Sequence, residues 1–220
     1  MTAKFARYTV HNPPGERMKP YYEENGITIY HGDCREILPN LPKVDLVLTD
    51  PPYGVGNFVQ VTGNVRGESV TWNDAIPTKD VFDMIKLVSK HRIIWGANYF
   101  NCFEPNGGTI VWKKNQPMPN FSKCEIASSS YLKKVELVEI TWTNFVNTKQ
   151  SCHPCERPVA LYVWCINYIP NSNTILDPFM GSGTTLVAAQ QLGRRAIGIE
   201  IERAYCDIAV NRLAQGVLNF

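Results

Sequence analysis

The chain has 220 residues, of which 44% are hydrophobic and 19% are charged, and its formal net charge is +2. This length suffices for one α/β domain with a full core and is short for two, so we predict a single domain over residues 1–220. The weak net charge does not by itself indicate a nucleic-acid-binding protein. Membrane-spanning proteins are excluded, since no apolar run approaches the ~18–20 residues that cross a bilayer.

The predicted elements alternate between strands and helices along the chain. After a polar arm over residues 1–26, strands are predicted at 27–30, 44–49, 91–96, 109–112, 135–142, 174–177 and 195–200. A helical turn at 34–38 and helices at 78–90, 158–169, 184–192 and 202–215 separate them, and the Gly-rich residues 54–74 form a loop. This alternation predicts an α/β fold with an open, mostly parallel, doubly wound sheet covered by helices on both faces.

The N-terminus and the cysteines indicate where the protein works. The first residues, Met1-Thr2-Ala3-Lys4, lack the apolar core of a secretory signal, so we expect a cytoplasmic protein. Seven cysteines in that reducing compartment do not predict a disulfide framework. Cys152-His153-Pro154-Cys155 is half of a zinc site, but a second ligand pair at metal spacing is missing, so we predict no metal.

Polar and aromatic residues gather where the predicted strands end. In open α/β sheets, ligands bind beyond the carboxyl ends of the strands. These ends carry Asp33, Asp50-Pro51-Pro52-Tyr53, Trp95-Gly96, Asp177 and Glu200. We therefore expect one site that draws on several of these segments.

A glycine loop, Asp177-Pro178-Phe179-Met180-Gly181-Ser182-Gly183-Thr184-Thr185, follows one strand and opens a helix. Its glycines allow a ligand to approach the backbone, and the helix N-terminus offers free N–H groups. It lacks the lysine of a Walker loop and the third glycine of a dinucleotide fingerprint. With Glu200 available for ribose hydroxyls, the loop predicts a nucleoside with a small carboxylate tail; the alternative is a strand–helix turn without a ligand.

Asp50-Pro51-Pro52-Tyr53 has the residue types that methylation of a nucleobase amine requires. Such an amine is a poor nucleophile because its lone pair is delocalised into the ring. The Asp50 carboxylate and the Pro51 carbonyl can accept its N–H groups, while Pro52 fixes their geometry in advance. The ring of Tyr53 can stack on a base that has been flipped out of a duplex. The alternative is an ordinary turn at the end of a strand.

The combination of motifs resembles the DNA N6-adenine and N4-cytosine amino-methyltransferases, in the circularly permuted order of the β group. The resemblance covers residues 27–215. Besides the tetrapeptide and the glycine loop, it includes Ile94-Trp95-Gly96-Ala97-Asn98-Tyr99-Phe100, Val111-Trp112-Lys113, His153-Pro154-Cys155-Glu156-Arg157-Pro158 and Ile197-Gly198-Ile199-Glu200.

This resemblance implies a seven-stranded class I methyltransferase sheet, S-adenosylmethionine as cofactor, and catalysis by Asp50, Pro51, Pro52 and Tyr53. The implied cofactor-binding residues are Asp33, Asp177, Phe179, Gly181, Ser182, Gly183, Thr184 and Glu200, with His153 and Arg157 near the methionine end. Arg157 stands where the family usually has lysine, which keeps the charge and changes its geometry. The Asp form of the tetrapeptide is more typical of adenine enzymes than of cytosine enzymes.

The expected partner is double-stranded DNA. Relatives insert a sizeable target-recognition region before the His-Pro segment, but only about ten residues are available here. Sequence specificity is therefore expected to come from residues 54–74 and 113–134 or from a homodimer; the alternative is that specificity is low. Candidate DNA contacts are Arg66, Trp72, Lys113 and Lys114. Cytosine N4, RNA or protein as the methyl acceptor, and a non-catalytic DNA-binding module, remain alternatives.

Overall fold

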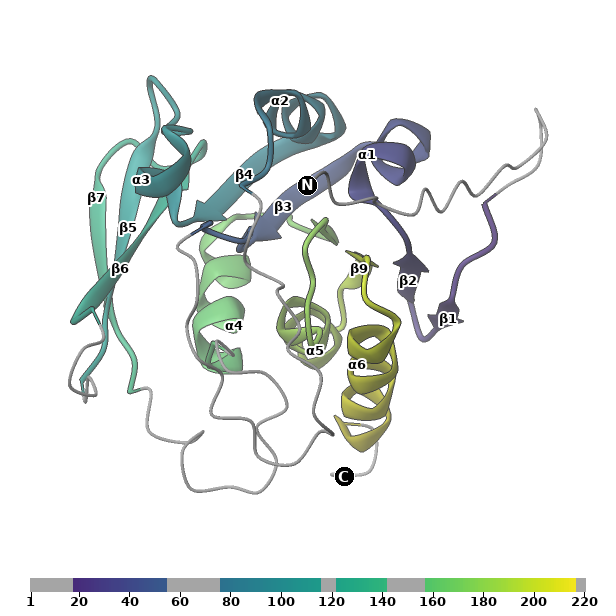
Figure 1. Cartoon of the computed structure of the whole chain (residues 1–220). Helices are drawn as coiled ribbons and strands as arrows, with labels where there is room; N and C mark the ends of the chain where they lie inside the picture. Colours follow the sequence, from purple (N-terminus) through teal and green to yellow (C-terminus); the bar gives the residue numbers. More distant parts are fainter. Residues whose placement is uncertain (1–17, 55–75, 116–121, 142–156, 217–220) are drawn as a thin grey trace, which may run out of the picture.

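The structure is a computed structural model that describes residues 18–54, 76–115, 122–141 and 157–216 (Figure 1). Its strands form one sheet in the order β1-β2-β9-β8-β3-β4-β6-β5-β7. Their bounds are β1 Tyr22–Glu24, β2 Ile27–His31, β3 Val44–Thr49, β4 Ser89–Trp95, β5 Gly108–Lys113, β6 Cys124–Ser129, β7 Val135–Glu139, β8 Thr174–Asp177 and β9 Arg195–Glu200. The five central strands, β2, β9, β8, β3 and β4, are mutually parallel, as predicted.

Helices cover both faces of this sheet. Figure 1 shows α1 and α2 on one side of the central strands and α4, α5 and α6 on the other. The helical segments are α1 Cys34–Ile37, the 3-10 turn η1 Leu38–Asn40, α2 Lys79–Val88, α3 Ala97–Phe100, α4 Val159–Tyr168, α5 Thr184–Gln191 and α6 Arg203–Gly216. Within the described residues, no helix combines the length and apolar character that a membrane span requires. The doubly wound α/β prediction is confirmed.

The two layers are held by two apolar clusters, one on each face. Leu46 and Leu48 of β3 pack with α4, α5 and α6, whereas Val47 packs with α1 and α2. This alternation follows from the strand period of two residues. All three side chains are fully buried, and each buried aliphatic side chain contributes about 1.5–3 kcal/mol to the driving force for folding.

Three elements were not anticipated from the sequence. Among the described residues the sheet has nine strands rather than seven, because β1 and β6 add to the seven predicted strands. β6 lies inside residues 113–134, which we expected to contact DNA, and Ala127, Ser128 and Ser129 are buried in it. That part of the segment is therefore interior sheet, and the contact of residues 113–134 with DNA stays a prediction. The short α3 was missed because four residues are too few to show helical periodicity.

The strand register brings the predicted ligand-binding ends to one edge. His31 pairs with Glu200, and Asp177 pairs with Gly198, two residues before Glu200. On the other side, Thr49 pairs with Ile94, one residue before Trp95. Since these strands are parallel, the segments that follow them emerge at the same edge of the sheet.

Candidate active site

The Asp50 tetrapeptide leaves β3 at this edge as a compact turn. Pro51 is buried, and Asp50 and Tyr53 are half-buried. The hydroxyl of Tyr53 donates to Oδ1 of Asp50 at 2.5 Å. Burial raises the pKa of Tyr53 well above its usual value, so the hydroxyl stays protonated and remains a donor. The carboxylate and the aromatic ring of the motif are therefore held together before any ligand binds.

The ring of Tyr53 is packed by the segment that follows β4. Tyr99 stacks on it with a centroid distance of 4.6 Å and an interplanar angle of 18°, and Phe100 meets it edge-on at 5.7 Å. Both residues belong to α3, which begins after Gly96. Gly96 has a φ of 70°, a left-handed conformation that glycine adopts without steric cost. The glycine after β4 thus shapes the support of Tyr53.

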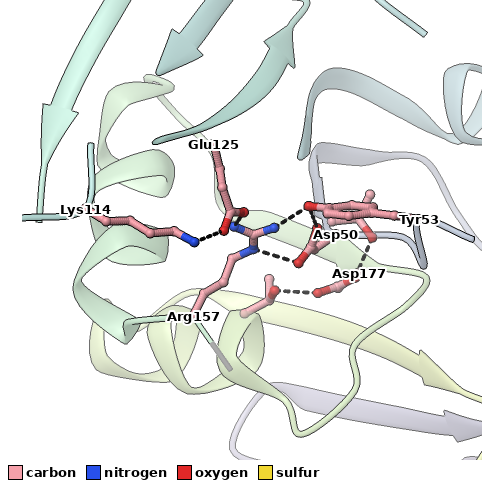
Figure 2. A network of polar contacts seen from close by, with 8 residues as sticks. Asp50, Tyr53, Lys114, Glu125, Arg157 and Asp177 are labelled. Atoms are coloured by element: carbon pink, nitrogen blue, oxygen red, sulfur yellow. Dashed lines mark hydrogen bonds and ion pairs between the residues drawn. The ribbon is translucent and has the colours of Figure 1, made fainter. Parts of the chain in front are cut away.

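Arg157 joins the tetrapeptide from the segment before α4. Its Nε donates to Oδ2 of Asp50 at 2.6 Å, Nη2 donates to the hydroxyl oxygen of Tyr53, and Nη1 donates to Glu125 (Figure 2). The guanidinium lies over the ring of Trp95 at 5.1 Å. Burial opposes the charge of Arg157, but the attraction of Asp50 and Glu125 outweighs it and holds its pKa above the usual range. We expected Arg157 near the methionine end of a cofactor; its contacts in the structure are with the tetrapeptide.

Glu125 is the functional candidate that the sequence did not reveal. It lies on β6, where it pairs in register with Trp112 of β5, and its carboxylate binds both Arg157 and Lys114. Burial opposes ionisation, but Arg157 and Lys114 together lower the pKa of Glu125. A lone glutamate in an unrecognised strand carries no motif, so no sequence signal pointed to it.

Asp177 organises the start of the glycine loop. Its Oδ1 accepts from the Thr49 hydroxyl at 2.7 Å and from the Phe179 N–H at 3.1 Å, and its Oδ2 accepts from the Thr185 hydroxyl. It therefore ties the end of β3 to the loop and to the first turn of α5. Burial raises the pKa of Asp177 to about 6. Its oxygens face protein donors, which makes it a support of the predicted cofactor loop.

The glycines of the loop allow the close turn into α5. Gly181 and Gly183 have φ values of 52° and 82°. A Cβ on Gly183 would lie 2.7 Å from Cβ of Ala209, so α6 packs directly against the loop backbone. Arg212 of α6 donates to the backbone oxygen of Ser182 at 2.8 Å and to the hydroxyl of Thr184 at 3.2 Å. These contacts hold the loop against α6.

Glu200 lies against the same loop, as its place at the end of β9 predicted. Its Oε2 accepts from the Gly181 N–H at 3.0 Å, and its Oε1 accepts from the Glu202 N–H at 2.8 Å. Burial raises its pKa to about 7. Asp33 follows the neighbouring strand, β2, where its carboxylate caps α1 at the Arg35 N–H and pairs with the Arg35 side chain. Two carboxylates thus flank the edge where the resemblance implies a nucleoside.

The predicted DNA contacts have different outcomes. Lys113 is exposed, and its Nζ lies 3.0 Å from Oε1 of Glu139. The side chain of Lys114 is only 5% exposed and pairs with Glu125. Its role as a DNA contact stays a prediction, made for a side chain that is buried beside Glu125 in this structure. Arg66, Trp72 and His153 lie outside the described residues.

No metal-binding cluster is present in the part of the chain that the structure describes: no group of three or more His, Cys, Asp or Glu side chains is arranged to hold an ion. The Cys152-to-Cys155 segment lies outside that part.

Comparison with known proteins agrees with the geometry of this edge. The DNA methylase family of N6 and N4 methyltransferases matches residues 128–211. The Type II methyltransferase M.ScaI of Streptomyces caespitosus is 25% identical over 255 residues, covering 89% of this chain and 84% of that protein. The crystal structure of the M1.HpyAVI–SAM complex has a TM-score of 0.58 at 25% identity, covering 85% of this chain and 98% of the other.

A further structural neighbour shows the fold alone. The PvuII DNA methyltransferase, described as cytosine-N4-specific, has a TM-score of 0.62 at 18% identity and covers 88% of each chain. The fold is therefore shared with class I methyltransferases, and the motifs lie at its ligand-binding edge. Together, the family match over residues 128–211, the relatives and the fold support the resemblance of this chain to the DNA amino-methyltransferases.

Proposed function

We propose that the protein transfers a methyl group from S-adenosylmethionine to the exocyclic amine of a base in DNA, with adenine N6 as the acceptor. The observation that carries this proposal is the position of Asp50. Its carboxylate lies at the same sheet edge as the glycine loop and Glu200, and it is joined there to Tyr53 and Arg157. An acceptor for an amine thus lies at the same sheet edge as a candidate nucleoside site.

Asp50 supplies the charge that the reaction needs. As the amine nitrogen forms its bond to the methyl carbon, it develops positive charge, which the Asp50 carboxylate stabilises. Among the described residues, each carboxylate oxygen of Asp50 accepts from one protein donor, Tyr53 or Arg157. Since a carboxylate oxygen accepts two hydrogen bonds, each retains capacity for an amine N–H. Asp50 can also receive the proton that the methylated amine releases.

The remaining tetrapeptide residues orient the base. The Pro51 carbonyl is a second acceptor for the amine, and Pro52 restricts the turn that carries both acceptors. The ring of Tyr53 offers an aromatic surface for stacking, and Tyr99 supports it from one side. The target amine is paired inside a duplex, so the base must leave the helix to reach Asp50.

The residues around the glycine loop fit S-adenosylmethionine. When bound, it supplies a methyl group on a positively charged sulfur. Glu200 offers its carboxylate to ribose hydroxyls, and Asp33 offers an acceptor for the adenine amino group. The backbone of the loop, with Phe179, Gly181, Ser182, Gly183 and Thr184, and the segment of His153 complete the proposed contacts. Asp177 and Arg157 act by holding the loop and the tetrapeptide, respectively.

Two findings support this cofactor and this acceptor class. M1.HpyAVI, which resembles the chain over 98% of its own length, was crystallised with SAM. M.ScaI is named a Type II methyltransferase, a class that modifies DNA. The choice of adenine rests on Asp50 at the first position of the tetrapeptide. Among the proposed DNA contacts, Lys113 is exposed at the end of β5, and Arg66 and Trp72 belong to residues 54–74, for which the sequence predicts a loop.

The test is identification of the product. The purified chain is incubated with methyl-labelled S-adenosylmethionine and unmethylated genomic DNA, which is then digested to nucleosides and analysed by mass spectrometry. We expect label in N6-methyladenine. Label in N4-methylcytosine would replace adenine by cytosine within the same family, and absence of label from DNA, with label in RNA or protein, would overturn the proposal.

A further inference from the structure

We propose that Glu125, backed by Lys114, is a positioning residue that aligns Arg157 with Asp50 and Tyr53 for methyl transfer. This inference rests on the proposed function, because it assigns roles around the same carboxylate. Neither residue belongs to the tetrapeptide or to the glycine loop. Both come from the two antiparallel strands at one side of the sheet, β5 and β6, with Lys114 directly after β5.

The first argument is that every nitrogen of the Arg157 guanidinium has a partner. Nε donates to Asp50, Nη2 to Tyr53 and Nη1 to Glu125 (Figure 2). A planar guanidinium with three fixed donors has one orientation. Glu125 is the partner on the side away from the tetrapeptide, so it determines how the other two nitrogens meet Asp50 and Tyr53.

The second argument is charge balance in a buried place. The side chains of Arg157 and Lys114 are 6% and 5% exposed, and those of Asp50 and Glu125 are 23% and 22% exposed. Two cations and two carboxylates form a neutral cluster. Removal of one charge from such a cluster leaves another buried without compensation, which is costly. Lys114 therefore supports Glu125, and Glu125 supports Arg157.

The third argument is the rigid frame around the cluster. The guanidinium of Arg157 lies over Trp95 at 5.1 Å and Trp112 at 5.8 Å, two fully buried rings on β4 and β5. Lys114 is fixed through its backbone N–H, which donates to the Lys123 backbone oxygen at 2.9 Å. The strands thus deliver Glu125 and Lys114 to the cluster with little freedom.

A chemical consequence follows for Asp50. With Glu125 neutral, the positive charge of Arg157 and Lys114 would face Asp50 alone. Arg157 would then move more fully onto the Asp50 oxygens and compete with the substrate amine for them. The loss should appear in the rate of methyl transfer, while the glycine loop and its cofactor contacts stay unchanged.

The experiment compares Glu125→Gln, Lys114→Met and the double variant under single-turnover conditions, with saturating S-adenosylmethionine and unmethylated genomic DNA. Misplacement of a catalytic group by about 1 Å costs up to ~100-fold, so we expect Glu125→Gln to slow transfer by about 10- to 100-fold. Lys114→Met alone should cost about threefold. The double variant restores neutrality between Asp50 and Arg157, and should therefore be at least about threefold faster than Glu125→Gln.

The matched control is Glu104→Gln. Glu104 forms a partly buried pair with Arg92, with Nε and Oε1 2.7 Å apart and both side chains 14% exposed. Glu104→Gln removes the same charge from an ion pair outside the proposed site, so it should lower the melting temperature without slowing methyl transfer. If Glu125→Gln does not fold, Glu125→Asp keeps the charge but withdraws it by one methylene, and should slow transfer several-fold with cofactor affinity unchanged.

Three results would overturn the inference. They are a wild-type rate for Glu125→Gln or Glu125→Asp, a double variant no faster than Glu125→Gln, and equal losses of rate in Glu125→Gln and Glu104→Gln. A slower double variant would mean that Lys114 acts separately, for example on DNA. If the wild-type chain methylates no DNA, the proposed function fails instead, so the two failures are distinguishable.

Discussion

Gly96 and Tyr53 lie so close that a Cβ atom on Gly96 would stand 2.2 Å from the Tyr53 ring. Real Cβ contacts are not this short, so the position after β4 excludes every side chain. The glycine therefore does more than permit a left-handed turn: it leaves room for the ring that points its hydroxyl at Asp50. The turn after β4 therefore leaves the space that the tetrapeptide after β3 occupies.

Gly96→Ala should displace Tyr53 and slow methyl transfer by at least about tenfold, since misplaced catalytic groups lose rate steeply. The control is Gly193→Ala. Gly193 also has a positive φ, 62°, but a Cβ there would meet nothing within 4 Å. Both variants should lose about 1–2 kcal/mol from backbone strain. Equal transfer rates for the two variants, measured with equal amounts of folded protein, would contradict this role of Gly96.

Asp177→Asn should destabilise the protein and weaken cofactor binding together. The new amide would present a donor where Asp177 accepts from Thr49, Phe179 and Thr185. A buried unsatisfied polar group costs about 1–3 kcal/mol, which urea unfolding would detect.

Asp45→Asn is the matched control for that variant. Asp45 lies at the other end of β3, where Oδ2 accepts from the backbone N–H groups of Asn173 and Thr174. Asp45→Asn should lower stability, while its affinity for S-adenosylmethionine, measured by calorimetry, should stay within about twofold of the wild-type value. An equal loss of affinity in both variants would show that Asp177 acts on stability alone.

Glu200 predicts a pH dependence of cofactor binding. Its pKa in the folded chain is raised by burial to about 7. Ribose hydroxyls donate to the ionised carboxylate, so affinity should rise with pH up to about 7 and then level off, by up to ~10-fold per pH unit below the midpoint. In Glu200→Gln the affinity should be about 10-fold lower at high pH and lack this titration. Calorimetric titrations between about pH 5.5 and pH 8.5 measure both.

The Glu200 carboxyl also affects the stability of the fold, which falls with rising pH while cofactor affinity rises. Because the folded-state pKa lies above the ordinary value of 4.5, the stabilising contribution of Glu200 is fully present below about pH 4.5 and is lost as the pH rises through about 7. Glu200→Gln should remove this part of the pH dependence of unfolding. A wild-type affinity that does not change with pH while the variant binds equally well would contradict the ribose role.

The sequence predicted the parts of the site that depend on local pattern. β-rich runs ended by Asp50-Pro51 and by Asp177-Pro178 located two strand ends, and the parallel alternation implied that they share an edge with Glu200. The same reasoning failed where a role depends on long-range pairing. Glu125 is a single carboxylate on a strand without clear periodicity, and only its register with Trp112 brings it to Arg157.

Arg157 and Lys114 show the same limit. Charged side chains are usually exposed, so the sequence favours a ligand or phosphate contact for each of them. Arg157 lies in the His-Pro segment, and Lys114 follows the exposed Lys113. Their burial follows from the stacking of Arg157 on Trp95 and from the carboxylates supplied by other strands. No local signal in the chain encodes these partners.

The central claim is that methyl transfer takes place at Asp50, and the most direct test is single-turnover transfer by Asp50→Ala alongside its affinity for S-adenosylmethionine. Because the variant removes the acceptor of the amine and leaves the glycine loop and Glu200 intact, we predict a loss of transfer of at least about 1000-fold. Cofactor affinity should remain within about threefold. Transfer to DNA by Asp50→Ala at a rate close to that of the wild-type chain would contradict the account.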